Sequence, residues 1–165
     1  MTTPTTTALF TEPASAQSLE RAAAALTANN FAAEILDDAA AARARIKDLI
    51  PEGASVFTGA SETLRLSGIE EDISKSGRYD DIRSRGQTMD RTTQLGEIWR
   101  LMSTPDVIVG SVAAVTETGS LVIASASGSQ LPGYAGGSPH IPQGCAVEPL
   151  RRAHHPVSRK LRRTL

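Results

Sequence analysis

The chain has 165 residues, of which 40% are hydrophobic and 21% charged. A chain of this length supports one hydrophobic core, so we expect one domain. This composition excludes collagen-like, disulfide-scaffold and wholly disordered proteins. Aromatic residues make up 4% of the chain, which disfavours proteins that bind single-stranded nucleic acids by stacking bases on exposed rings.

The charge is unevenly distributed along the chain. Six of the 17 basic side chains lie in residues 149–165, which contain no acid, so residues 1–148 carry a net charge of −7. An acidic body of this kind is not typical of DNA-binding or membrane-binding folds. The sequence therefore predicts neither a specific nucleic-acid partner nor a membrane partner.

The single cysteine, Cys145, allows no internal disulfide. The first ten residues, MTTPTTTALF, lack the basic and apolar regions of a signal peptide. No apolar run approaches the ~20 residues that a membrane-spanning helix needs. We therefore expect a soluble, cytoplasmic protein.

The first half of the chain alternates between helical and extended patterns. Residues 1–13, rich in Thr and Pro, are expected to form a flexible arm. Strong helix formers predict a helix over residues 15–29, alternation predicts a strand over residues 31–36, and a second helix is expected over residues 38–50 with an Asp as its cap. The next strand covers residues 54–59.

The second half continues this alternation. A third helix begins after Ser61, its expected N-cap, and a short strand follows around residues 79–82. A helix is expected over residues 90–102, with one face formed by Leu95, Ile98, Leu101 and Met102. Residues 106–110 have a buried-strand pattern. The chain then continues with a single turn over residues 111–119, a strand over residues 120–125 and a Gly/Ser-rich loop over residues 127–139.

This order predicts an α/β fold with a mostly parallel sheet, and ligands of such folds bind at the carboxyl ends of the strands. Three segments are expected at that edge. The first is the strand-to-helix turn with Gly59, Ser61 and Thr63, where glycine permits close approach and the hydroxyls lie beside free amides. A capped helix without a ligand explains the same residues equally well.

The second segment contains Gly110, Ser111, Thr116 and Glu117. Glu117 is the one acid in the apolar stretch that follows Asp106, and it is a candidate base or nucleophile. The alternative is that its carboxylate fixes the turn by accepting hydrogen bonds from backbone amides.

The third segment is the loop with Gly128, Ser129 and Gln130, whose amide and hydroxyl groups could bind an anion or a carbonyl, or simply form a flexible loop. Cys145, His154 and His155 match no strong metal-ligand spacing, so no metal site is expected. No dinucleotide, iron–sulfur or serine-hydrolase signature is present, and the cofactor is left unknown.

Several stretches together resemble the LUD domain, named for lactate utilization, in its short single-domain version. The resemblance covers about residues 20–141 and rests on PEGASVFTGASETLRLSGI, SGRYDDIRSR and DVIVGSVAAVTETGSLVIASASGSQLPGYAGGSPHI. It implies a Rossmann-like α/β fold related to the sugar-phosphate isomerase and CoA-transferase group. It also implies a role in lactate oxidation beside iron–sulfur partner proteins.

The sequence departs from the family pattern in two places. The family often has His where this chain has Ala113, which removes an acid–base pair with Glu117. After Ile141 the family continues with a strand, a helix and a closing strand, whereas residues 142–165 are rich in Pro, His and Arg. We therefore expect residues 14–141 to form the domain, followed by an irregular basic tail, in a truncated or frameshifted member that lacks the closing elements.

The leading functional hypothesis is an accessory protein of lactate or hydroxy-acid utilization that binds a small carboxylate or phosphate ligand. One alternative is an isomerase-type or transferase-type enzyme that uses Glu117. Another is an inactive remnant. A homo-oligomer is a further expectation, because a sheet without its closing elements exposes an edge strand.

Overall fold

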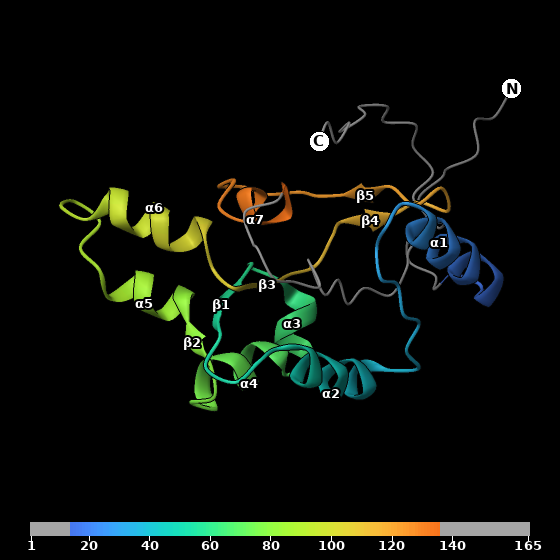
Figure 1. Ribbon diagram of the computed structural model, residues 1–165, viewed down its shortest axis with the longest axis horizontal. Helices are drawn as coiled ribbons and strands as arrows, with labels where there is room; N and C mark the ends of the chain where they lie inside the picture. Colours follow the sequence, from blue (N-terminus) through green and yellow to red (C-terminus); the bar gives the residue numbers. More distant parts are fainter. Residues whose placement is uncertain (1–13, 136–165) are drawn as a thin grey trace, which may run out of the picture.

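The structure is a computed structural model that describes residues 14–135 (Figure 1). The predicted arm over residues 1–13, the basic tail over residues 142–165 and the expected loss of closing elements after Ile141 all concern residues outside this part. The helices are α1 (Ala16–Ala28), α2 (Ala39–Leu49), α3 (Glu62–Leu66), α4 (Ile69–Lys75), α5 (Ile82–Thr88), α6 (Leu95–Ser103) and α7 (Leu131–Ala135). The strands are β1 (Ser55–Thr58), β2 (Asp80–Asp81), β3 (Val107–Val109), β4 (Ala114–Val115) and β5 (Leu121–Val122).

The central sheet has three parallel strands in the order β2-β1-β3. Strand β1 lies in the middle, and its residues 56–58 pair with residues 107–109 of β3. These residues are all buried, as expected for apolar runs in a parallel sheet that is covered on both faces. The structure confirms the predicted α/β, Rossmann-like fold class.

Helices cover both faces of this sheet, because successive side chains of a strand point in opposite directions. Val56, Val107 and Val109 join one cluster with apolar residues of α2, α3 and α4. Phe57 and Ile108 point the other way and pack with Ile82 of α5, Leu101 and Met102 of α6 and Tyr134 of α7. In Figure 1, α2, α3 and α4 lie on one side of β1 and β3, and α7 on the other.

Residues 111–125 differ from the prediction. The segment expected to be a single turn contains β4, which pairs antiparallel with β5 in a separate two-stranded sheet. The connection is a tight turn in which the Gly119 amide donates to the Thr116 carbonyl (3.0 Å) and Gly119 has φ +77°. A glycine in this conformation at the end of a tight turn is typical of a hairpin. A strand does form within residues 120–125, but it pairs antiparallel with β4 and not with the parallel sheet.

Four other features of the structure differ from the sequence predictions. Residues 31–36 form no strand, because Phe31, Ile35 and Leu36 remain exposed and no described segment pairs with them. The third helix is divided into α3 and α4 at Gly68, whose φ of +78° is left-handed. The sequence prediction missed α5, and it placed Leu95 on the packed face of a helix although Leu95 is 51% exposed.

Helix α1 packs against the turn of the β4–β5 hairpin. The Asn29 side-chain amide donates to the Gly119 carbonyl (3.1 Å), and Arg21 donates two hydrogen bonds of 3.0 Å to the Glu117 carboxylate. A Cβ on Gly119 would lie 2.7 Å from the Ala25 carbonyl carbon. Glycine is therefore required here both by its backbone conformation and by the proximity of α1.

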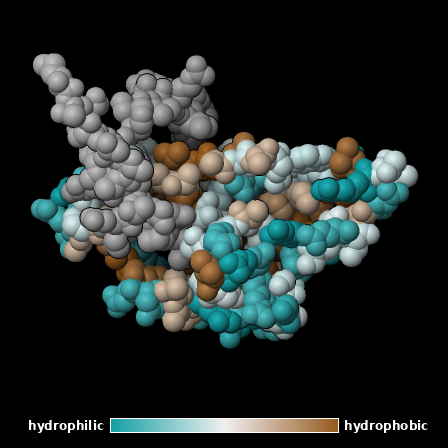
Figure 2. All heavy atoms as spheres, turned by 180° about the vertical axis from the view of Figure 1, so that it is seen from behind, coloured by the Kyte–Doolittle hydropathy of each residue, from teal (hydrophilic) through white to brown (hydrophobic). Residues whose placement is uncertain are grey.

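The surface is mostly hydrophilic, with large apolar side chains at separate places. On the face in Figure 2, hydrophobic residues occur among hydrophilic ones. Leu66 of α3, Leu95 and Trp99 of α6, and Val122 of β5 are among the exposed apolar side chains. Within residues 14–135, no helix combines the length and the hydrophobicity needed to span a bilayer.

Gly119→Ala is expected to destabilise the fold more than Gly53→Ala. Both glycines have left-handed φ values, +77° and +78°, so alanine costs about 1 kcal/mol at either position. At Gly119 the new Cβ also meets the α1 backbone, whereas nothing lies within 4 Å at Gly53. Overpacking of this kind adds about 1–3 kcal/mol. Equal losses in urea denaturation would contradict the packing of α1 on the hairpin.

Candidate functional site

The carboxyl ends of β1 and β3 lie side by side because the two strands are parallel and Thr58 pairs with Val109. The Gly59 amide donates to the Val109 carbonyl at 3.1 Å and extends this pairing by one residue. The loops that begin at Gly59 and Gly110 therefore leave the sheet at the same edge, which is the usual ligand-binding edge of α/β folds.

Two serine hydroxyls meet at this edge. Ser61 Oγ lies 2.9 Å from Ser111 Oγ, although 50 residues separate them in the chain. Ser61 Oγ also accepts a hydrogen bond from the Leu64 amide (3.3 Å) and caps α3. Thr63 lies in the first turn of that helix. Ser61 is thus a helix cap, as one interpretation of the sequence held, and it is also part of an inter-loop hydroxyl pair.

Two glycines allow α7 and the residue before it to approach the same edge closely. A Cβ on Gly59 would lie 2.4 Å from Gln130 Oε1, and a Cβ on Gly110 would lie 2.0 Å from Tyr134 Oη. Neither glycine has a left-handed φ. Glycine is therefore needed at both positions because another part of the chain comes within contact distance, rather than because of backbone conformation.

The loop before α7 positions Gln130. Gly128 has φ +72°, its amide donates to Ser125 Oγ (3.0 Å), and its carbonyl accepts from the Leu131 amide (3.0 Å). The Ser129 hydroxyl lies 3.0 Å from the Ser127 hydroxyl. Gln130 Nε2 donates to the Ala124 carbonyl (3.3 Å) while its oxygen lies over Gly59. The turn at Gly128 and Ser129 thus holds the Gln130 amide at the edge of the sheet.

Tyr134 is a site residue that the sequence analysis did not select. Its hydroxyl is buried and has no hydrogen-bond partner among the described residues. Burial raises the pKa of the Tyr134 phenol, so the hydroxyl stays protonated at neutral pH. The available sequence signal was its spacing, because a side chain four residues after Gln130 lies on the same side of a helix.

Thr116 and Glu117 lie in a different contact group. The Thr116 hydroxyl accepts from the Ser120 amide (2.9 Å) within the hairpin turn. The Glu117 carboxylate accepts from Arg21 of α1, and both side chains are 44% exposed. Hydrogen bonds from Arg21 and Asn29 connect this turn to α1. A separate set of contacts at the edge of the sheet involves Gly59, Ser61, Gly110, Ser111 and Gln130. A catalytic role for Glu117 stays a prediction.

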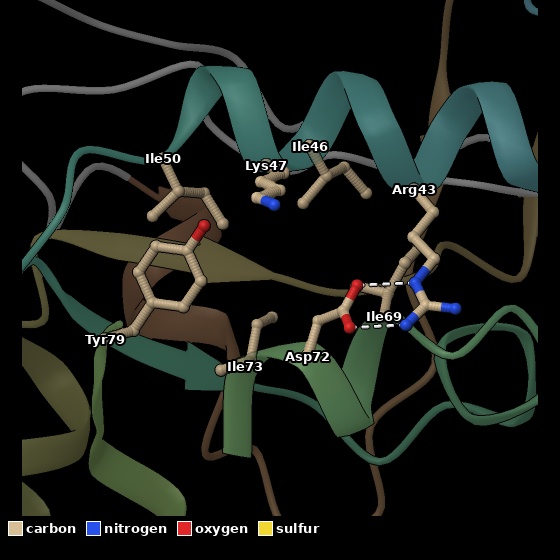
Figure 3. A pocket seen from close by; sticks show the side chains of 8 residues that line it. All are labelled: Arg43, Ile46, Lys47, Ile50, Ile69, Asp72, Ile73 and Tyr79. Atoms are coloured by element: carbon tan, nitrogen blue, oxygen red, sulfur yellow. Dashed lines mark hydrogen bonds and ion pairs between the residues drawn. The ribbon is translucent and has the colours of Figure 1, made fainter. Parts of the chain in front are cut away.

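A small cavity of about 10 Å³ lies between α2 and α4. Figure 3 shows Ile46 of α2 and Ile50, the residue that follows α2, facing Ile73 and Tyr79, with the Arg43–Asp72 ion pair at one end. The hydrogen bond from Arg43 lowers the pKa of the Asp72 carboxyl. A volume of this size holds about one water molecule. The cavity is therefore a packing gap beside the core and shares no residue with the sheet-edge group.

No cluster of three or more potential metal ligands occurs within residues 14–135. Cys145, His154 and His155, which the sequence analysis considered, lie outside the described residues. The polar groups assembled at the edge of the sheet are hydroxyls and a carboxamide. Such neutral groups suit hydrogen bonding to a small organic ligand better than metal coordination.

A protein-family model described as the LUD domain matches residues 19–139. The match includes the Ser61–Ser111 contact, the hairpin and α7. Searches among curated proteins and among solved structures found no match.

Ser61→Ala is expected to lower the free energy of unfolding by about 1 kcal/mol more than Ser111→Ala. Both variants lose the hydroxyl pair, but only the first also removes the cap of α3. Urea denaturation of the two variants measures the difference. A Ser111→Ala loss as large as that of Ser61→Ala would mean that the cap contributes nothing to stability.

Proposed function

The chain belongs to the LUD domain family, and we propose that it binds a small carboxylate-bearing ligand at the carboxyl edge of β1 and β3 as an accessory protein of hydroxy-acid metabolism. The family is associated with lactate utilization, which supports a ligand of the size of lactate or pyruvate. The observation that carries the proposal is the 2.9 Å contact between Ser61 and Ser111 beside the Gln130 amide.

The chemistry of this edge supports a compact ligand with hydrogen-bond acceptors. The Ser61 and Ser111 hydroxyls are only partly buried, and each can donate to a carboxylate oxygen. The Gln130 amide can both donate and accept, so it can bind the hydroxyl or keto oxygen next to that carboxylate. Gly59 and Gly110 are buried and have no side chains, so a ligand of a few heavy atoms could contact their backbone atoms directly.

A carboxylate fits this site better than a phosphate. The side chains that meet there, those of Ser61, Ser111 and Gln130, are neutral. Phosphate sites usually use Arg, Lys or a helix N-terminus. Helix α3 has only five residues, so few aligned peptide dipoles support an anion at its start. A phosphate ligand is therefore the less favoured of the two expectations.

The accessory role rests on the same neutrality. General acid–base chemistry needs a group that changes its protonation state within reach of the ligand. The Glu117 carboxylate accepts hydrogen bonds from Arg21 of α1, and burial raises the pKa of the Tyr134 phenol, which keeps it neutral. Action beside iron–sulfur proteins of lactate oxidation is implied by the family resemblance and belongs to this proposal. A cytoplasmic location and a homo-oligomeric state stay predictions.

Lactate and pyruvate are expected to raise the melting temperature of the wild-type protein. A ligand that binds only the native state adds about 2.7 kcal/mol of stability at one hundred times its Kd. The Ser61→Ala, Ser111→Ala double variant should lose this response. Ser74→Ala on α4 should keep it, because Ser74 is exposed and lies outside the site. Thermal-shift assays in lactate, pyruvate, sugar phosphates and CoA esters, at matched ionic strength, make the comparison.

Three results would count against this proposal. Stabilisation by sugar phosphates with none by lactate or pyruvate would exclude a carboxylate as the ligand class. Turnover of any ligand that disappears in Glu117→Gln, with the fold intact, would show an enzyme that uses Glu117. Loss of the lactate response in Ser74→Ala would show that the response does not report on the edge of the sheet.

A further inference from the structure

We propose that α7 is a cap over the ligand site and that the Tyr134 hydroxyl is a specificity-determining donor to the ligand's carboxylate. This inference rests on the proposed function, since it concerns the same site. It adds a residue from a separate element and a movement of that element. The observation behind it is a buried phenol hydroxyl without a partner, held against the backbone of Gly110.

The ring of Tyr134 is anchored by packing. It lies against the cluster of Phe57, Ile82 and Ile108 on one face of the sheet. The Tyr134 amide donates to the Gln130 carbonyl (3.2 Å), so the two side chains are presented by the same helical turn. This arrangement places the hydroxyl at the carboxyl end of β3, one residue before Ser111. The hydroxyl therefore lies at the edge where the two serines meet.

The unpartnered hydroxyl makes the ligand-free arrangement unfavourable. A buried polar group without a hydrogen bond loses its interaction with water and gains nothing in return. Because burial raises the pKa of this phenol, it is a neutral donor under physiological conditions. An acceptor that enters the site restores the missing hydrogen bond, and a carboxylate is the strongest such acceptor among small organic groups.

Tyr134 and Gln130 also cover the glycines that the ligand must approach. The Tyr134 hydroxyl and the Gln130 oxygen lie against Gly110 and Gly59, so entry of a ligand requires α7 to move outward. This helix has five residues and follows the left-handed turn at Gly128. Its first residue, Leu131, is 44% exposed. Such a short and partly exposed element can shift while the backbone pairing of β1 with β3 stays in place, although the Tyr134 ring then loses packing against Phe57 and Ile108.

The sequence contains two tyrosines, and this makes a matched comparison possible. Tyr79 also has a buried hydroxyl with no partner among residues 14–135, but it packs on the opposite face of the sheet, beside the cavity in Figure 3. Tyr134→Phe and Tyr79→Phe therefore remove the same kind of group from the two faces. Neither variant should lower the ligand-free melting temperature, since each deletes an unsatisfied hydroxyl.

Sodium lactate is the probe, with sodium chloride at equal ionic strength as the reference. Tyr134→Phe is expected to weaken lactate binding about tenfold or more, and Tyr79→Phe to leave it unchanged. In Tyr79→Phe, Tyr134 is the single tyrosine, and Trp99 is present in both variants, so a tyrosine difference band on adding lactate that occurs only in Tyr79→Phe reports on Tyr134. The near-ultraviolet difference spectrum should show this band in Tyr79→Phe and lack it in Tyr134→Phe.

Equal lactate affinity in Tyr134→Phe and wild type, with binding lost in the double serine variant, would overturn this inference and leave the proposed function standing. No lactate or pyruvate response in the wild type would overturn the proposed function and this inference with it. Should Tyr134→Phe fail to fold, Gly110→Ala serves as the second variant, because its Cβ displaces the Tyr134 hydroxyl. Unchanged lactate binding in folded Gly110→Ala would equally contradict the role of Tyr134.

Discussion

The parallel pairing of β1 with β3 is the constraint on which the rest of the structure depends. Val56, Phe57 and Thr58 match Val107, Ile108 and Val109 in register, and this single alignment separates the apolar residues into two clusters on opposite faces. It also directs both following loops to one edge. Ser61 lies three residues beyond the end of β1, and Ser111 lies two residues beyond the end of β3. Without that register, the two hydroxyls could not meet.

Close approach, rather than charge, characterises the candidate site. Glycine at positions 59 and 110 lets Gln130 and Tyr134 reach the edge of the sheet, and the result is a small group of neutral donors and acceptors. The hydrogen bonding of this group is incomplete, since the Tyr134 hydroxyl has no hydrogen-bond partner in the described part of the chain. A buried polar group without a hydrogen bond is rare in native proteins and calls for an explanation, and the proposed ligand would supply one.

The hairpin β4–β5 and α1 form a second structural unit beside the sheet (Figure 1). Here Glu117 accepts hydrogen bonds from Arg21, and Gly119 lets α1 approach the turn. In both places, a glycine without a side chain lets a neighbouring helix approach closely. They differ in the groups that are brought together: an exposed ion pair in one case, and a partly buried group of neutral polar side chains in the other.

Local sequence determined the strands β1 and β3, the caps Ser15, Asp38 and Ser61, and the position of Gly59 and Ser61 after a strand, since these depend on apolar runs and short-range hydrogen bonds. The alternation of helical and extended patterns predicted the α/β fold class, and the family resemblance added the expectation of a Rossmann-like fold. Only the tertiary structure decided that residues 114–122 form a hairpin, that Glu117 pairs with an arginine 96 residues away, and that Tyr134 reaches Gly110. The last two contacts join segments that lie far apart in the chain. The two strands of the hairpin have only two residues each, too few for a local pattern to distinguish them from a turn.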